Sequence, residues 1–276
     1  MLPDPLLFLL GVVVGTFGTL VGAGGGFVLV PLLALLEPAL ATAAVTGVSL
    51  AVVAFNATSG ALAYARDRRI DYRSGIPFAV ATLPGSVLGA IITQYLDRHW
   101  FDIAFSILLV GLAALLIRRG EAAPHVETAE GSGRWHVARD LTDRSGTRHR
   151  YRVNLPTGVA ISFVVGFASS LLGIGGGIIH VPVLIGVLGF PTHIATATSH
   201  FVLAIMATAG TLTHLVAGDL RGLERQTVIL GIGAVIGAQI GARLSTRVHG
   251  LLIVRALAVG LAFVGLRLGA KAMFGL

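Results

Sequence analysis

Residues 14–33 read VGTFGTLVGAGGGFVLVPLL, and residues 165–184 read VGFASSLLGIGGGIIHVPVL. The two stretches align without a gap and share 10 of 20 residues, including the glycine runs Gly24–Gly26 and Gly175–Gly177. A match of this length is hard to obtain by chance, even in apolar sequence. We therefore predict that the chain is a tandem duplication of one unit.

The composition places that unit in a membrane. Of the 276 residues 55% are hydrophobic and only 12% are charged, and the mean hydropathy is +0.87, whereas soluble domains carry about 25% charged residues. The formal charge of +7 comes from Arg residues between apolar stretches, a pattern typical of loops that set membrane topology rather than of a nucleic-acid surface. The chain has no Cys, which excludes disulfides and thiolate chemistry.

The fold class follows from the apolar stretches, several of which reach the roughly 20 residues of a membrane-spanning helix. They cover residues 5–21, 26–37, 42–65, 75–96, 100–117, 156–172, 177–190, 194–217, 226–246 and 250–270. We predict an all-α polytopic integral membrane protein with two homologous halves and 8–10 transmembrane segments with glycine-broken helices. The predicted organisation is a first half at 1–118, a polar cytoplasmic connector at 119–153 and a second half at 154–276.

The long polar stretch Arg118–Val153 contains eight Arg, five acidic residues and three His. It is either a regulatory or partner-binding loop or a partly disordered connector, and we favour the connector. Two topologies stay open. If 26–37 and 177–190 re-enter the membrane, each half crosses four times; if they span, each half crosses five times and the second half is inverted. The excess of Arg puts the large loop on the cytoplasmic side in both cases.

The glycine runs are the clearest chemical signal. Glycine lowers the cost of unwinding a helix, and a helix that restarts after a break offers unpaired N–H groups and a positive dipole end. Inside a membrane protein such an end is a natural anion site. The alternative is close helix packing through Gly18, Gly22 and Gly26, which explains a four-residue spacing but not three consecutive glycines.

Hydroxyl and amide groups accompany the glycine runs. Ser49 and Asn56 share one helix face in the first half, and Thr198 and Ser199 lie in the matching stretch of the second half. They suit an oxyanion, although such groups also bond their own helix.

Histidines provide the titratable groups. Four lie in the second half, at His180, His193, His200 and His214. We favour His200 as a proton carrier, because it adjoins Ser199. His180 stands where the first half has Leu29, and was therefore not expected to be a duplicated requirement. Since no pair has the i, i+4 spacing of a helical metal pair, we expect no metal and no cofactor.

None of the 13 Asp and Glu residues lies well inside an apolar stretch, which disfavours a cation exchanger and suits an anion. No nucleotide-binding P-loop occurs. We find no paired carboxylates or GxSxG motif either, so we expect that the protein is not an enzyme.

The repeated GxGGGxxxxP block and the ATxTS-like segment that follows it resemble the TauE/SafE family of sulfite-exporter-like membrane proteins. The GxxxGA elements at Gly85–Ala90 and Gly237–Ala242 do so too. The chain departs from the family at Val45–Ser49, where VTGVS replaces the ATxTS-like segment. The resemblance covers the chain outside residues 120–153 and implies a secondary transporter of small sulfur-containing or organic anions, such as sulfite, sulfoacetate, sulfonates or thiosulfate.

The leading hypothesis is thus a multi-pass plasma-membrane anion transporter, with proton coupling as an option. Its rivals are an anion channel and, less favoured, a membrane-embedded enzyme or assembly factor. Expected partners are the small anionic substrate and the lipid bilayer, with a homodimer as an allowed assembly and no nucleic acid. The predicted substrate-binding residues are Gly24, Gly25, Gly26, Ser49, Asn56, Gly175, Gly176, Gly177, Thr198, Ser199 and His200.

Overall fold

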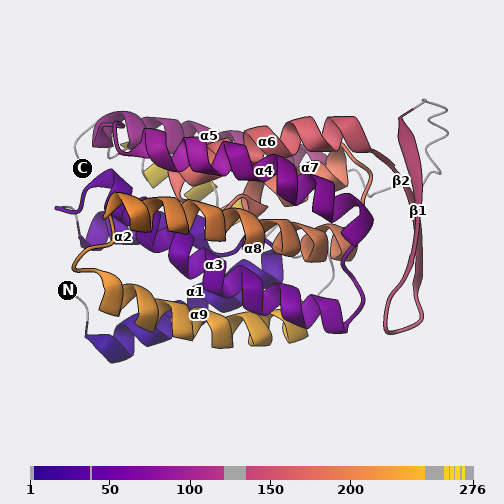
Figure 1. The fold of residues 1–276 in the computed structure, drawn as a ribbon, viewed down its shortest axis with the longest axis horizontal. Coiled ribbons are helices and arrows are strands. Elements are labelled where there is room, and N and C mark those ends of the chain that lie inside the picture. Colours follow the sequence, from indigo (N-terminus) through magenta and orange to yellow (C-terminus); the bar gives the residue numbers. More distant parts are fainter. Residues whose placement is uncertain are drawn as a thin grey trace.

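A computed structural model describes residues 3–37, 39–120, 135–245 and 258–270, apart from 261, 264 and 268. These residues form a helical bundle with one β-hairpin at its end (Figure 1). The helices are α1 (Asp4–Val21), α2 (Gly26–Leu36), α3 (Thr42–Arg66), α4 (Tyr72–Thr93), α5 (Arg98–Gly120), α6 (Leu155–Leu172), α7 (Gly177–Gly186), α8 (Thr192–Ala217) and α9 (Glu224–Ser245), and the strands are β1 (His136–Thr142) and β2 (Arg148–Asn154). The described residues from 258 to 270 are also helical.

Six of the described helices are long and apolar enough to cross a membrane: α1, α3, α4, α6, α8 and α9. This confirms the predicted all-α polytopic membrane class. Among the described helices α2 and α7 are shorter, with 11 and 10 residues, because the glycine turns delay their start. The apolar helical stretches at His99–Gly111 and Ala258–Arg267 are also shorter.

The two central helices, α3 and α8, run antiparallel (Figure 1). Gly47 near the start of α3 packs against His214 near the end of α8, and Gly60 near the end of α3 packs against His200. Since α3 and α8 occupy matching places in the alignment of the two halves, the matched helices run in opposite directions. The predicted duplication itself stays a prediction.

The outer helices pair across the predicted halves. Gly11 and Gly15 of α1 lie against the backbone of Leu230 and Ala234 of α9, so these two helices run parallel and in close contact. On the other side of α3 and α8, α4 packs on α6 in the same way. Small residues allow this close approach.

The short helix α2 returns to the side from which α1 enters. Asp4 at the start of α1 pairs with Arg225 at the start of α9. Gly47 lies close to Leu220, just before α9, so α3 begins on this side too. Residues 37–41 link α2 to α3, which brings α2 back to the same side. In the structure α2 therefore returns to the side where α1 begins, and the helices matched in the alignment run in opposite directions. The number of membrane crossings in each half stays a prediction.

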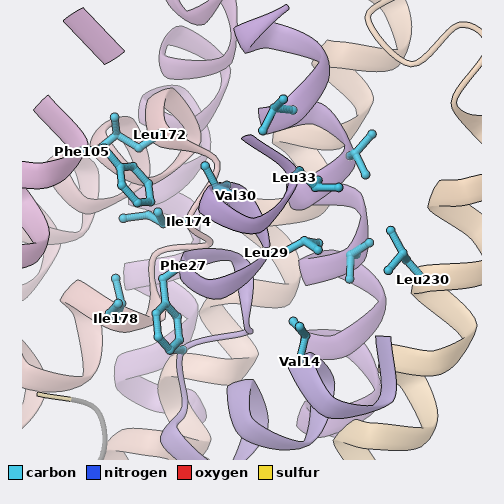
Figure 2. Close-up of a cluster of buried hydrophobic side chains, with 14 of the residues drawn as sticks. Val14, Phe27, Leu29, Val30, Leu33, Phe105, Leu172, Ile174, Ile178 and Leu230 are labelled. Atoms are coloured by element: carbon cyan, nitrogen blue, oxygen red, sulfur yellow. The ribbon is translucent and has the colours of Figure 1, made fainter. Parts of the chain in front are cut away.

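A hydrophobic core surrounds the two glycine turns. Figure 2 shows Phe27 and Leu29 of α2 within the same buried cluster as Ile178 of α7 and Ile174 of the turn before it. All four side chains are fully buried. The turns therefore lie inside the protein, where irregular backbone is tolerated at membrane depth.

Part of the predicted connector is an ordered hairpin. Strands β1 and β2 pair antiparallel, with His136 opposite Asn154 and Thr142 opposite Arg148. Val153 is fully buried in a cluster with Leu184 of α7 and with residues at the start of α8. This packing orders the segment despite its polar composition. Residues 121–134 of the predicted connector lie outside the described part.

Candidate functional site

Two glycine turns build the centre of the bundle. Helix α1 ends because Gly22 adopts a left-handed backbone (φ 82°), and Gly24 and Gly25 keep positive φ values of 75° and 86° before α2 begins. In the matching turn Gly173 and Gly175 have φ values of 68° and 66°. Residues with a side chain rarely adopt these positive φ values, whereas glycine does so easily. The glycine runs therefore end one helix and allow the next to begin at both places.

Each helix start packs directly on the backbone of the other turn. A Cβ added at Gly26 would lie 2.7 Å from the carbonyl oxygens of Gly173 and Ile174. A Cβ at Gly177 would collide with the carbonyl of Gly22. The two turns therefore cross at van der Waals distance, and no larger residue fits at the crossing.

Backbone N–H groups remain unpaired at both helix starts. Within the described part of the chain, those of Gly25, Gly26 and Phe27 reach no acceptor at the start of α2. At the start of α7 the N–H groups of Gly176 and Ile178 likewise reach no acceptor among the described residues. Together with the helix dipole, such groups favour a negatively charged ligand.

Two serines tie the turns to the central helices. Ser49 of α3 donates its hydroxyl to the carbonyl of Gly173 at 2.6 Å. Ser199 of α8 reaches the carbonyl of Gly22 at 3.4 Å. Each central helix therefore holds the turn of the opposite half.

A small cavity lies at the start of α7. Its volume is about 10 Å³, enough for about one water molecule. Its walls are partly polar and partly apolar, and the lining residues are Thr82, Val165, Gly176, Gly177, His180, Ser199, Val202, Leu203 and Met206.

The structure separates the predicted site residues into groups. Gly176, Gly177 and Ser199 line the cavity. Gly26 lies at the crossing of the turns, and Ser49 bonds to the turn at Gly173. Gly24 and Gly175 pack against Val53 of α3, and Gly25 packs against Val14 of α1. Asn56, Thr198 and His200 are absent from the lining, and each has neighbours of its own.

Asn56 and His200 both hold helices together. The Asn56 amide donates to the carbonyl of Gly15 at 2.8 Å, and its oxygen accepts from the Thr19 hydroxyl at 3.0 Å. The Nε2 atom of His200 lies 3.3 Å from the same hydroxyl, and its ring meets Tyr64 edge-on at 5.6 Å. Both side chains are therefore interhelical bridges, although Nδ1 of His200 has no hydrogen-bond partner among the described residues.

Thr198 belongs to a polar network at the hairpin end of the bundle. Its hydroxyl accepts the N–H of Asp71 at 3.0 Å. The Asp71 carboxylate lies 3.4 Å from Nε of Arg139 on β1 and accepts from the Tyr151 hydroxyl on β2 at 3.0 Å. Burial, and then the neighbouring Asp71 carboxylate, raise the pKa of Tyr151, so its hydroxyl stays a donor at neutral pH. Arg139 also donates to Ser74 at 2.9 Å.

Four polar residues near the cavity were not among the predicted site residues: Thr82, Ser162, Ser169 and His180. The signal for His180 was present, because a histidine three residues after Gly177 lies one helical turn into α7. The mismatch with Leu29 argued against it. Ser162 and Ser169 carried no signal, since the neighbours that bring them to this place, His180 and Gly176, lie outside their own helix.

The family model for "Sulfite exporter TauE/SafE" matches residues 7–268. The chain belongs to the TauE/SafE family. The "Probable membrane transporter protein YunE" of Bacillus subtilis is 31% identical over 275 residues, which cover 98% of each chain. Archaeal and proteobacterial relatives extend this similarity. A "Probable membrane transporter protein" of Methanocaldococcus jannaschii is 25% identical over 77% of this chain and 73% of its own length.

A protein of the same description from Xylella fastidiosa is 28% identical over 86% of this TauE/SafE chain and 83% of its own length. No solved structure matches the chain. The family and these relatives indicate a membrane transporter rather than an enzyme.

Proposed function

We propose that this TauE/SafE protein is a secondary transporter of small sulfur-containing or organic anions, of the sulfite, sulfoacetate, sulfonate or thiosulfate type. The observation that carries the proposal is the start of α7, where unpaired N–H groups meet a cavity lined by Ser199 and Thr82. Oxyanions accept hydrogen bonds from such donors. None of the cavity-lining residues is a carboxylate, so nothing there repels an anion.

A transporter suits this site better than a channel. The cavity of about 10 Å³ is smaller than any of these anions, so the substrate has to enter through a movement of the surrounding helices. Matched helices that run in opposite directions provide two related bundles that rock about one central site. A channel would need a continuous passage instead.

We propose that the protein lies in the plasma membrane and that the hairpin end of the bundle faces the cytoplasm. Arg66, Arg69 and Arg73 lie at the corner between α3 and α4, and five further Arg of the hairpin region join them: Arg139, Arg144, Arg148, Arg150 and Arg152. An excess of Arg marks cytoplasmic loops. The start of α1 then faces the outside.

Flux into proteoliposomes tests the proposal. Purified protein should take up at least one labelled anion from a panel of sulfite, thiosulfate, sulfoacetate and a short alkyl sulfonate, and an opposing gradient of the same anion should drive exchange. Gly176→Ala should reduce uptake about tenfold, because the added Cβ lies 3.2 Å from both Met206 and Ser169 and fills the cavity edge.

Gly111→Ala is the matched control, since a Cβ at this exposed position of α5 meets nothing within 4 Å. It should transport normally. Conductive flux that no gradient can drive uphill would favour the channel, and wild-type protein that moves none of these anions would contradict the proposed function.

A further inference from the structure

His180 is a buried titratable side chain at the cavity. It lies three residues into α7, is only 2% exposed and lines the cavity with Ser199 and Thr82. Its Nε2 atom is 3.2 Å from the hydroxyl oxygen of Ser162. That hydroxyl donates its proton to the carbonyl of Gly158 at 2.7 Å. Ser162 therefore accepts from His180, which fixes a proton on Nε2 and leaves Nδ1 as the basic nitrogen.

A second buried polar group, the Ser169 hydroxyl, lies close to the start of α7. The Ser169 hydroxyl is fully buried and has no hydrogen-bond partner among the described residues. It faces the turn, 3.2 Å from the position that a Cβ on Gly176 would take. An unsatisfied buried hydroxyl costs about 1–3 kcal/mol, so its presence points to a ligand or water that completes it.

These polar groups occur on one side of the crossing only. In the ungapped alignment Ser162, Ser169 and His180 correspond to Gly11, Gly18 and Leu29. Gly11 and Gly18 pack against backbone, and Leu29 is buried in the hydrophobic core. The start of α2 is therefore closed by packing, whereas the start of α7 carries a site with three polar side chains.

Among the described residues that line the cavity around His180, none carries a fixed charge. Phe78 of α4 meets its ring edge-on at 6.0 Å, Ser162 comes from α6, and Ser199 and Val202 come from α8. Among the cavity-lining residues His180 is the only one with a side chain that can take up a proton to become a cation. A proton at this side chain is therefore the charge that offsets a bound anion in a low-dielectric site.

We propose that the start of α7 is the single anion site of the protein and that His180 binds one proton together with each anion. This inference rests on the proposed anion transport and names its coupling. The anion accepts hydrogen bonds from the N–H groups of α7 and from Ser169, and the proton enters at Nδ1 of His180 and leaves with the anion. The substrate is thus an oxyanion carried with one proton, and His200 takes no part.

The test measures initial uptake of the best panel anion by proteoliposomes at symmetric pH values from 5.5 to 8.5. Wild-type uptake should rise as the pH is lowered across this range, because each anion enters with one proton, and a dye inside the vesicles should report acidification as the anion enters. His180→Gln should lose both the pH dependence and the acidification. His200→Gln and His214→Gln are matched controls that should keep them.

Ser169→Ala adds a readout that does not require loss of the histidine. It should raise the KM for the anion about tenfold while the pH profile keeps its shape. An unchanged pH profile in His180→Gln, or wild-type anion entry without acidification, would overturn the inference while leaving anion transport intact. Absence of any wild-type uptake would overturn the proposed function and the inference with it.

Discussion

Ser49 of α3 donates its hydroxyl to the carbonyl oxygen of Gly173 at 2.6 Å. The bond joins a central helix of the first half to the glycine turn of the second half. Both groups are buried, so water cannot replace the hydroxyl if it is removed. This contact anchors the turn between the end of α6 and the start of α7.

Ser49→Ala should therefore lower the free energy of unfolding by about 1–2 kcal/mol and reduce transport, because the turn before α7 loses its anchor. Thermal unfolding in detergent and uptake by proteoliposomes measure the two effects. Thr208→Ala is the control. Its hydroxyl is exposed and bonds to the carbonyl of Ala204 in its own helix, so neither stability nor uptake should change. A stable, fully active Ser49→Ala protein would show that the bond does not position the turn.

Gly177→Ala should be more damaging than any serine variant. Its Cβ would meet the backbone of Gly22 and Ala23, which cannot move aside without shifting the whole turn. We expect a loss of about 2–3 kcal/mol in unfolding free energy, visible as a lower midpoint of thermal unfolding. Gly111→Ala should leave that midpoint in place, because the added Cβ meets nothing within 4 Å. Equal midpoints for both variants would contradict the close crossing of the two turns.

The features of the fold that depend on local sequence alone were predictable. Positive φ values at Gly24 and Gly25 are a local requirement that only glycine meets easily, so the breaks were visible as runs of glycine. Spanning helices follow from apolar length alone. The topology was harder, because the direction of α2 depends on where α3 begins rather than on its own eleven residues.

The site was only partly predictable, because the role of a buried polar side chain depends on the residues that surround it in the fold. Asn56 looked like a ligand-binding amide, yet it bridges the carbonyl of Gly15 and the hydroxyl of Thr19. His180 looked incidental, yet it lines the cavity. Spacing along one helix cannot distinguish these outcomes, because the partners lie on other helices. The ordered hairpin escaped prediction for the same reason.

Arg139→Ala should release the hairpin from the bundle. Arg139 and Asp71 are both buried, and removing one partner leaves an uncompensated charge that costs about 3 kcal/mol. Protection of β1 and β2 against hydrogen exchange should fall sharply. In Arg148→Ala an exposed ion pair with Asp140 is lost instead, and protection should stay within about twofold of wild type. Full protection in Arg139→Ala would show that apolar packing around Val153 is sufficient for docking.

Asp143 makes the hairpin turn sensitive to acid. Burial raises the pKa of this carboxyl, but hydrogen bonds from Ser145, the Thr147 N–H and His149, together with Arg69, outweigh burial and hold the pKa below its usual value. A carboxyl with a lowered pKa in the folded state adds stability at all pH values above the unfolded value of about 3.9 and loses it as the pH falls through the lower folded value. We therefore expect the turn to be insensitive to pH from 8 to 5 and to open below about pH 4.

Trp135 directly precedes β1 and can report this opening by fluorescence in a Trp100→Phe background, which removes the second tryptophan of the chain. The wild-type signal should be flat above pH 5 and change at lower pH. Asp143→Asn cannot titrate and loses the charge that Arg69 and His149 face, so its hairpin should be looser at neutral pH and show a smaller acid response. If Asp143→Asn and wild type showed the same acid transition, the transition would belong to other carboxyls and Asp143 would only shape the turn.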